Sequence, residues 1–502
     1  MFDCFEEQKA LVTELVNIRS VVGSEGCEQA MADFLYGKLS EWDYFKARPE
    51  DLFMLPTEND SLKRSSVVAL VRGSAAERLW GEGKTSPAVL LLGHLDTVET
   101  SDYGSLEPLA TKPAELLEAF RSMNISPEFS ANLESGRYML GRGALDMKSG
   151  VASHMFILKY FSEHRDELNG SLIALFECDE EGDSHGMLTS VGFIKKLAEE
   201  RGIAIKAAVC ADYSSQEAAV YLGTIGKYLP CAMAFGAGSH VGQVFSSMDP
   251  NLIISELTRA IDYNTEFCEE ALGELTPPPV SLKQCDTKAS YSVQTAESAY
   301  AYFNWFALRK SGDEILSICK SEAEKAGQRA AAKLNAGKAV YAEKIKALGG
   351  DPSKDESLKP AEPPRVFTLK EYAEKLDVAL RSPDPYTDIR SFMVSEAARV
   401  RMEDPDRSPV VLVFMAGISY PPITVERSSE LGQAAEKLGI PVRTYYPFIS
   451  DTSFVSLLGD VPALNLGTYG KDAHMFTERV DMDYSFRQLP NLSWKLLKAL
   501  LR

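Results

Sequence analysis

The feature that most constrains the fold is a set of three continuous apolar runs, at residues 88–96 (AVLLLGHLD), 171–178 (SLIALFEC) and 203–212 (IAIKAAVCAD). Runs without polar alternation are typical of strands that are buried on both faces of a sheet. Amphipathic helical patterns separate these runs, at residues 150–161 and 190–202. This strand–helix–strand order predicts an α/β domain with a mostly parallel sheet.

The α/β pattern stops after Asp212 and resumes much later. Residues 221–238 contain Gly and Pro and indicate antiparallel strands, and an Ala/Lys/Glu-rich helix is expected over 313–350. An apolar run at 408–417 indicates another buried strand, like those of the first α/β segment. We therefore expect an inserted α+β domain, with the chain divided into residues 1–213, 214–395 and 396–502.

Composition narrows the class of protein. The net charge of −19 argues against binding to nucleic acid or to an anionic membrane, which both need basic patches. No apolar run approaches the roughly 20 residues of a membrane span, and the first residues lack the pattern of a secretory signal. The eight cysteines are scattered without a CxxC pair, which favours free thiols in the cytoplasm.

Polar residues follow the apolar runs at the points where strands are expected to end. They are His94, Asp96, Asp146, Glu180, Glu181, Asp212 and His474. The carboxyl ends of parallel strands converge on one crevice, so we expect these side chains to meet there. Two imidazoles with several carboxylates suit zinc, or a pair of divalent metals bridged by a carboxylate. Taken alone, the acidic cluster at 179–181 favours a solvated turn, and a structural histidine at position 94 is as good as a ligand.

The sequence also resembles the M20 family of metallopeptidases and deacylases. The resemblance rests on five motifs in family order: GHLD (93–96), GRGALDMKSG (141–150), DEEGDSHG (179–186), AD (211–212) and DAHMFTE (472–478). Within the family the chain is most similar to the RocB branch, which is associated with arginine utilisation. That similarity rests on DYFKARPEDLFMLP (43–56), GKYLPCAMAFGAGSHVG (226–242) and PFISDTSF (447–454).

The resemblance implies a zinc-peptidase-like α/β domain that carries two zinc ions per subunit, with cobalt or manganese as alternatives. Asp146 is expected to bridge the two ions. His94 and Asp212 complete one site, and Glu181 and His474 complete the other. The resemblance also implies a cis peptide bond between Asp146 and Met147.

The remaining roles are likewise implied by the resemblance. Glu180 is the expected general base, and Asp96 is expected to orient His94. His240 corresponds to a histidine that relatives carry on the inserted lid and dimerisation domain and present to a partner subunit, where it stabilises the oxyanion. Asp451, Thr452 and Ser453 match a segment near the substrate pocket, with a helix N-cap as the alternative role.

The sequence therefore predicts a cytoplasmic, zinc-dependent hydrolase of amide bonds that forms a homodimer. Its substrate is expected to be a dipeptide or an N-acyl amino acid. The alternative is a non-catalytic metal-binding or regulatory protein that retains the M20 fold, although the intact Glu180 argues against it. We expect the remaining histidines, His154, His164 and His185, to have structural, surface or loop roles.

Overall fold

The computed structural model describes residues 2–123, 125–214, 216–383 and 387–501. These residues form two units. Unit 1 extends to Ile225 and resumes at Ile423, and unit 2 is Gly226–Pro422.

Both unit boundaries lie further along the chain than the expected divisions after residues 213 and 395. The first differs because β7 (Val220–Thr224) pairs with β18 (Ala463–Asn465) in the sheet of unit 1. The second differs because β15 (Val410–Met415) pairs with β9 (Pro230–Phe235) inside unit 2. The apolar run at 408–417 therefore does not resume the first sheet, which corrects the expected third segment.

Unit 1 is built on a nine-stranded sheet with the order β1-β2-β5-β3-β6-β18-β7-β16, and β17 also pairs with β7. Besides β7 and β18, its strands are β1 (Leu52–Pro56), β2 (Ser65–Arg72), β3 (Ser86–His94), β5 (Ser171–Glu177), β6 (Ile203–Cys210), β16 (Ile423–Thr424) and β17 (Val442–Arg443). The central strands β5, β3, β6 and β18 are parallel, and antiparallel strands flank them. The α/β prediction is confirmed, and the parallel part is the centre of the sheet.

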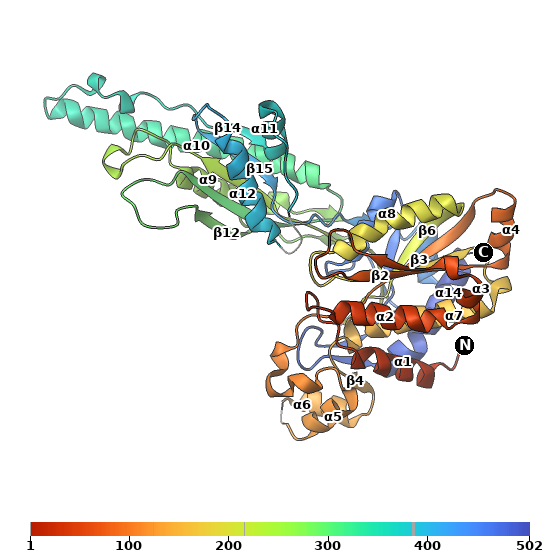
Figure 1. The fold of residues 1–502 in the computed structure, drawn as a ribbon. Helices are drawn as coiled ribbons and strands as arrows, with labels where there is room; N and C mark the ends of the chain where they lie inside the picture. Colours follow the sequence, from red (N-terminus) through yellow and green to blue (C-terminus); the bar gives the residue numbers. More distant parts are fainter. Residues whose placement is uncertain (1, 124, 215, 384–386, 502) are drawn as a thin grey trace. The chain divides into compact units, whose positions relative to one another are not determined.

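Helices cover both faces of this sheet, which explains why its central strands are apolar throughout. Figure 1 shows α8 on one face and α1, α2 and α7 on the other. The α-helices of unit 1 outside residues 101–135 are α1 (Phe5–Asn17), α2 (Cys27–Ser40), α3 (Asp43–Ala47), α4 (Ser74–Gly81), α7 (Ser149–Glu163), α8 (His185–Glu200), α13 (Glu430–Glu436) and α14 (Leu489–Leu500). All residues of β2 and β5 are buried between these layers.

A helical insertion, residues 101–135, lies between β3 and β4 in the sequence. It contains η2 (Ser101–Leu109), α5 (Pro113–Arg121) and α6 (Pro127–Glu134). Its apolar cluster includes Phe120 and Phe129 and extends to Phe476 from the C-terminal part of the chain. β4 (Tyr138–Leu140) follows this insertion in the sequence. It belongs to a three-stranded sheet with β19 (Gly470–Lys471) and β20 (Arg479–Asp481), the strands before and after the loop that carries His474.

Unit 2 contains a six-stranded sheet with the order β12-β13-β9-β15-β14, and β8 also pairs with β13. Besides β9 and β15, the strands of this sheet are β8 (Gly226–Tyr228), β12 (Val280–Asp286), β13 (Ser298–Ala307) and β14 (Arg365–Thr368). A separate two-stranded sheet is formed by β10 (Glu270–Ala271) and β11 (Glu274–Leu275). The α-helices of unit 2 are α9 (Pro250–Ile261), α10 (Gly312–Ala347), α11 (Leu369–Leu376) and α12 (Ile389–Met402). One apolar cluster joins α9 and α10 to the sheet and another joins α11 and α12 to it.

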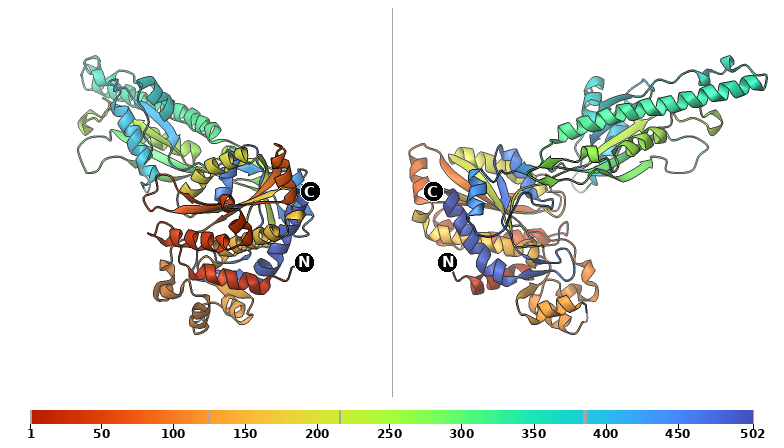
Figure 2. Two further views of the ribbon diagram at one scale, coloured as in Figure 1. Left: turned by 45° about the vertical axis from the view of Figure 1, so that its right-hand side comes forward. Right: turned by 180° about the vertical axis from the view of Figure 1, so that it is seen from behind.

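The long helix α10 runs beside the strands of unit 2 (Figure 2). It begins at a capping box in which Ser311 and Glu314 satisfy one another's backbone N–H groups. Its N-terminal half buries Ile315, Cys319 and Ala323 at helical spacing against the sheet. The helix expected over 313–350 is confirmed, and it ends at Ala347, shortly before Gly349.

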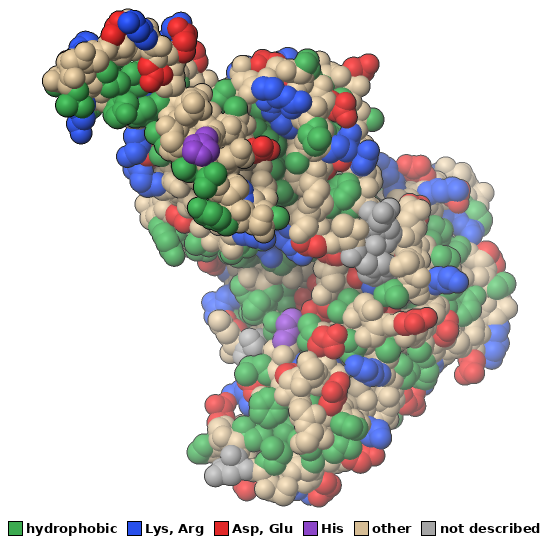
Figure 3. Space-filling view, turned by 60° about the vertical axis from the view of Figure 1, so that its left-hand side comes forward, with side chains coloured by type: hydrophobic (Ala, Val, Ile, Leu, Met, Phe, Trp, Pro, Cys, Tyr) green, Lys and Arg blue, Asp and Glu red, His purple; other side chains and the backbone are tan. Residues whose placement is uncertain are grey.

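The surface is mixed in charge. On the face drawn in Figure 3, acidic and basic side chains are interspersed. Among the described residues, no helix combines the length and the apolar composition that a membrane span requires.

Candidate metal and catalytic site

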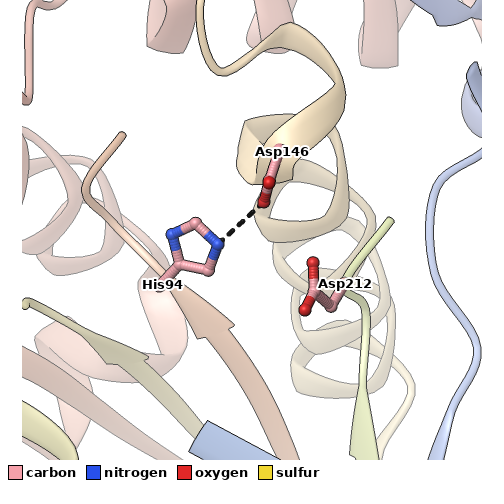
Figure 4. Close-up of side chains that lie close together, drawn as sticks. All are labelled: His94, Asp146 and Asp212. Carbon is pink, nitrogen blue, oxygen red and sulfur yellow. Dashed lines mark hydrogen bonds and ion pairs between the residues drawn. The ribbon is translucent and has the colours of Figure 1, made fainter. Parts of the chain in front are cut away.

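Three side chains from different elements meet at the carboxyl end of the central strands of unit 1. His94 ends β3, Asp146 lies in the turn before α7, and Asp212 follows β6 (Figure 4). His94 Nε2 lies 3.0 Å from Asp146 Oδ1. One potential ligand atom from each of the three residues falls within 4.8 Å of the others. The predicted convergence of strand ends therefore occurs.

Asp146 also faces a second group of potential ligands. His474 Nε2 lies 2.9 Å from Asp146 Oδ2 and 3.1 Å from Glu181 Oε1. The two carboxylate oxygens of Asp146 are thus directed at two different imidazoles, as a bridging ligand requires. His94, Glu180 and Glu181 form a third group with the same spacing.

The donor set fits divalent cations. Burial, together with repulsion from Asp146, raises the pKa of Asp212 to about 7. Burial also raises the pKa values of Glu180 and Glu181, and repulsion from neighbouring carboxylates raises both values further. Hydrogen bonds with Asp146 and Glu181 raise the pKa of His474 to about 10. So many buried carboxylates are costly to ionise unless cations compensate them, and oxygen and imidazole donors are ligands that such cations accept.

Asp96 contacts both His94 and the turn that carries Glu180 and Glu181. Its backbone carbonyl oxygen lies 3.1 Å from His94 Nδ1, whereas its nearest carboxylate oxygen is 3.6 Å away. Its two carboxylate oxygens accept hydrogen bonds from the backbone N–H groups of Glu180 (3.3 Å) and Glu181 (2.9 Å). Asp96 therefore fixes the turn that directs both glutamates at the site.

A buried ionic network holds the same turn from the other side. The Arg64 guanidinium donates to Glu28 (3.1 Å), Asp179 (2.6 Å) and Asp60 (3.0 Å). The other oxygen of Asp179 lies 2.7 Å from His185 Nδ1. His185 is the first residue of α8 and not part of a loop, so this contact ties the start of that helix to the Asp179 turn. Sequence reasoning missed Glu28 and Arg64, since nothing in their local sequence marks them as partners.

We expect Arg64→Met to lower the free energy of unfolding by about 3 kcal/mol, because it leaves buried carboxylates without a counter-charge. Urea unfolding measures the change. The control is Arg121→Met, which removes an exposed ion pair with Glu118 and is expected to change stability by less than about 1 kcal/mol. Equal effects of the two replacements would contradict the importance assigned to the network.

Glu478 fixes the turn that carries Asp146. Its Oε1 accepts hydrogen bonds from the backbone N–H groups of Leu145 (3.0 Å) and Asp146 (3.3 Å). Its Oε2 accepts one from Arg142 (2.8 Å). The peptide bond between Asp146 and Met147 is cis, as expected. Glu478 lies within the DAHMFTE motif, so its position beside His474 in the sequence was the signal that could have identified it.

Two other histidines belong to none of these groups. His240 is exposed on a loop of unit 2, where its Nδ1 accepts a hydrogen bond from the Gly242 N–H. His154 is buried in α7 with Nε2 3.1 Å from the Leu92 carbonyl oxygen, in agreement with its expected structural role. The role expected for His240 stays a prediction.

Asp451, Thr452 and Ser453 begin η9 (Asp451–Leu458) in unit 1, and all three are buried. Burial, followed by repulsion from Glu177, raises the pKa of Asp451 well above its ordinary value. The N-cap position of this helix is Ser450, so the alternative N-cap role for the three residues is wrong. A role in substrate binding stays a prediction.

Comparison with known proteins gives a consistent result. The model of the peptidase family M20/M25/M40 matches residues 90–493. Protein RocB of Bacillus subtilis (strain 168) is 30% identical, with 97% of this chain and 94% of RocB covered. The uncharacterized protein YqjN of the same organism is 31% identical, with 99% and 97% covered.

Among solved structures, the aminopeptidase PepT from Bacillus cereus ATCC 10987 aligns with 99% of each chain at a TM-score of 0.56 and 11% identity, which supports the fold. The family model covers most of the chain, and the two Bacillus subtilis relatives match almost all of it. The resemblance drawn from the motifs is confirmed. The chain belongs to the peptidase family M20/M25/M40 and is a metallo-hydrolase that acts on amide bonds.

Proposed function

We propose that the protein is a zinc-dependent hydrolase that cleaves the amide bond of a dipeptide or an N-acyl amino acid. The observation that carries the proposal is the position of Asp146, whose two oxygens face His94 and His474 at 3.0 and 2.9 Å. A carboxylate shared between two imidazoles is an arrangement that suits a pair of divalent ions such as zinc.

In this proposal Asp146 would be shared by two ions. His94 and Asp212 would hold one ion, and Glu181 and His474 would hold the other. Bound there, the ions would polarise the substrate carbonyl and lower the pKa of a water molecule. Cobalt or manganese would accept the same oxygen and nitrogen donors.

Glu180 acts as the general base. Its Oε2 lies 4.0 Å from His94 Nε2, so it is beside the proposed ligands, and its backbone is fixed by Asp96. Burial raises the pKa of Glu180, which makes its carboxylate a stronger base than an exposed one. The carboxylate takes a proton from the attacking water and then delivers it to the leaving amine nitrogen.

Unit 2 serves as a lid and dimerisation domain in this proposal, and the active form is a homodimer. His240 donates a hydrogen bond to the oxyanion that forms in the active site of the partner subunit. Asp451, Thr452 and Ser453 contribute to the substrate pocket. All eight cysteines lie among the described residues as free thiols, which supports a cytoplasmic location.

We expect His240→Ala to lower turnover by about 10²–10³-fold, the usual loss when one oxyanion donor is removed. The metal content per subunit should not change, because His240 is outside the proposed ligand set. Steady-state kinetics and metal analysis of the same preparation measure both quantities. His164→Ala, at an exposed histidine after α7, is the matched control, and turnover equal to that control would remove the oxyanion role.

A substrate screen tests the proposal as a whole. Dipeptides and N-acyl amino acids are offered to the metal-free protein after addition of zinc, cobalt or manganese, and metal binding is measured in parallel. Hydrolysis that depends on metal and is lost in Glu180→Gln supports the proposal. Metal binding without hydrolysis of any member of either class would favour the non-catalytic alternative.

A further inference from the structure

The loop that carries His474 has a backbone that its neighbours must hold in place. Asp472 and His474 both have positive φ values, 60° and 64°. Residues other than glycine rarely adopt this left-handed region, and they keep it only where surrounding contacts fix it. The contacts that fix this loop therefore decide where the His474 imidazole lies.

Arg479, which is almost completely buried, closes the loop across its base. Its Nη1 donates a hydrogen bond to the Thr477 carbonyl oxygen (3.0 Å) and another to Asp472 Oδ2. The same oxygen of Asp472 accepts a hydrogen bond from Thr477 Oγ1 (2.8 Å). One guanidinium thus ties together the two ends of the segment that contains His474.

The same guanidinium connects the loop to the helical insertion, residues 101–135. Arg479 Nε donates to Asn132 Oδ1 on α6 (3.2 Å), and its Cζ lies 5.0 Å from the centroid of the Phe129 ring. Phe476, between His474 and Arg479 in the sequence, packs against Phe120 of α5 with ring centroids 6.0 Å apart. The loop therefore contacts the insertion through Arg479 and Phe476. It contacts the turn that carries Asp146 through Glu478.

We propose that Arg479 is a positioning residue through which the helical insertion holds His474 in the geometry that binds metal. The inference rests on the proposed function, because it takes His474 as a ligand. It assigns the insertion a role in metal affinity at the Glu181–His474 site and none at the His94–Asp212 site. A purely structural role would lower stability without distinguishing the two sites.

The test measures the binding of Co²⁺ to the metal-free full-length protein. Calorimetry gives the affinities, and visible absorption reports the environment of the bound ions. Wild type is expected to bind two Co²⁺ per subunit. Arg479→Leu should weaken one of the two by roughly 10–100-fold and alter its absorption band, since loss of a partner that orients a ligand has this effect. Affinity for the other ion should stay the same.

Asn132 provides a milder pair of variants that keeps the test decisive if Arg479→Leu does not fold. Asn132→Leu removes the acceptor and should weaken the same Co²⁺ by about tenfold, whereas Asn132→Asp keeps an acceptor oxygen and should bind like wild type. The control is Lys471→Ala, which removes only the exposed ion pair with Glu128 between the same two segments. It should leave both affinities unchanged.

Different outcomes separate this inference from the proposed function. Equal weakening of both ions, or unchanged binding in Asn132→Leu accompanied only by a lower melting temperature, would overturn the positioning role and leave the two-metal site intact. Wild type that fails to bind two Co²⁺ would overturn the proposed site itself, and the inference with it.

Discussion

Glu180→Gln is expected to lower turnover by about 10²–10⁴-fold, the usual contribution of a positioned general base. The amide has the size and shape of the carboxylate but cannot accept a proton. Metal content should stay at the wild-type value, because the proposed ligands are intact and the Glu180 backbone keeps its hydrogen bond to Asp96. Kinetics on a confirmed substrate and metal analysis of the same preparation measure the two effects.

Glu181→Gln is expected to lose metal, unlike Glu180→Gln. Its turnover should fall as a consequence of that loss. Glu181 Oε1 lies 3.1 Å from His474 Nε2, within the group that Asp146 completes. Glu177→Gln is a matched control, since Glu177 is also buried at the end of β5 but lies outside the three ligand groups. Equal loss of metal in Glu180→Gln and Glu181→Gln would contradict the separate roles.

The sequence predicted the elements of the fold better than their assembly. The apolar runs that became β3, β5 and β6 were clear because strands buried on both faces have few polar residues. The helix over 313–350 was clear from its composition and from the glycines after it. The unit boundaries were missed because an apolar strand such as β15 (Val410–Met415) pairs equally well in either sheet, and only tertiary contacts decide.

The same contrast holds in the site. His94 and Asp212 were predictable because they lie at the carboxyl ends of strands that end at one rim. The sequence could not connect Arg64 to Glu28 and Asp179, because these charges are far apart along the chain and meet only after folding. The same is true of Arg479, since its partner Asn132 lies in the first chain segment of unit 1 whereas Arg479 lies in the second. The proposed ligands follow from local pattern, whereas the roles of Arg64 and Arg479 follow only from tertiary contacts.

Asp146→Asn is expected to remove metal from both sites and to lower turnover by more than about 10⁴-fold, since each ion contributes several kcal/mol to stabilising the transition state. Asparagine keeps the size of the side chain and one carbonyl oxygen, but its amide nitrogen cannot replace the second oxygen. The two oxygens of Asp146 face different histidines, at 3.0 and 2.9 Å, so losing one of them would break the proposed bridge.

Metal per subunit and turnover of Asp146→Asn are compared with those of wild type treated with a chelator, because the two preparations should behave alike. Asp51→Asn serves as the control, since Asp51 is a buried carboxylate of unit 1 that pairs with Arg72 and belongs to none of the ligand groups. It is expected to cost stability but to keep both ions. If Asp146→Asn retained two ions per subunit, Asp146 could not be the bridge, and the proposed sites would have to be filled by separate sets of ligands.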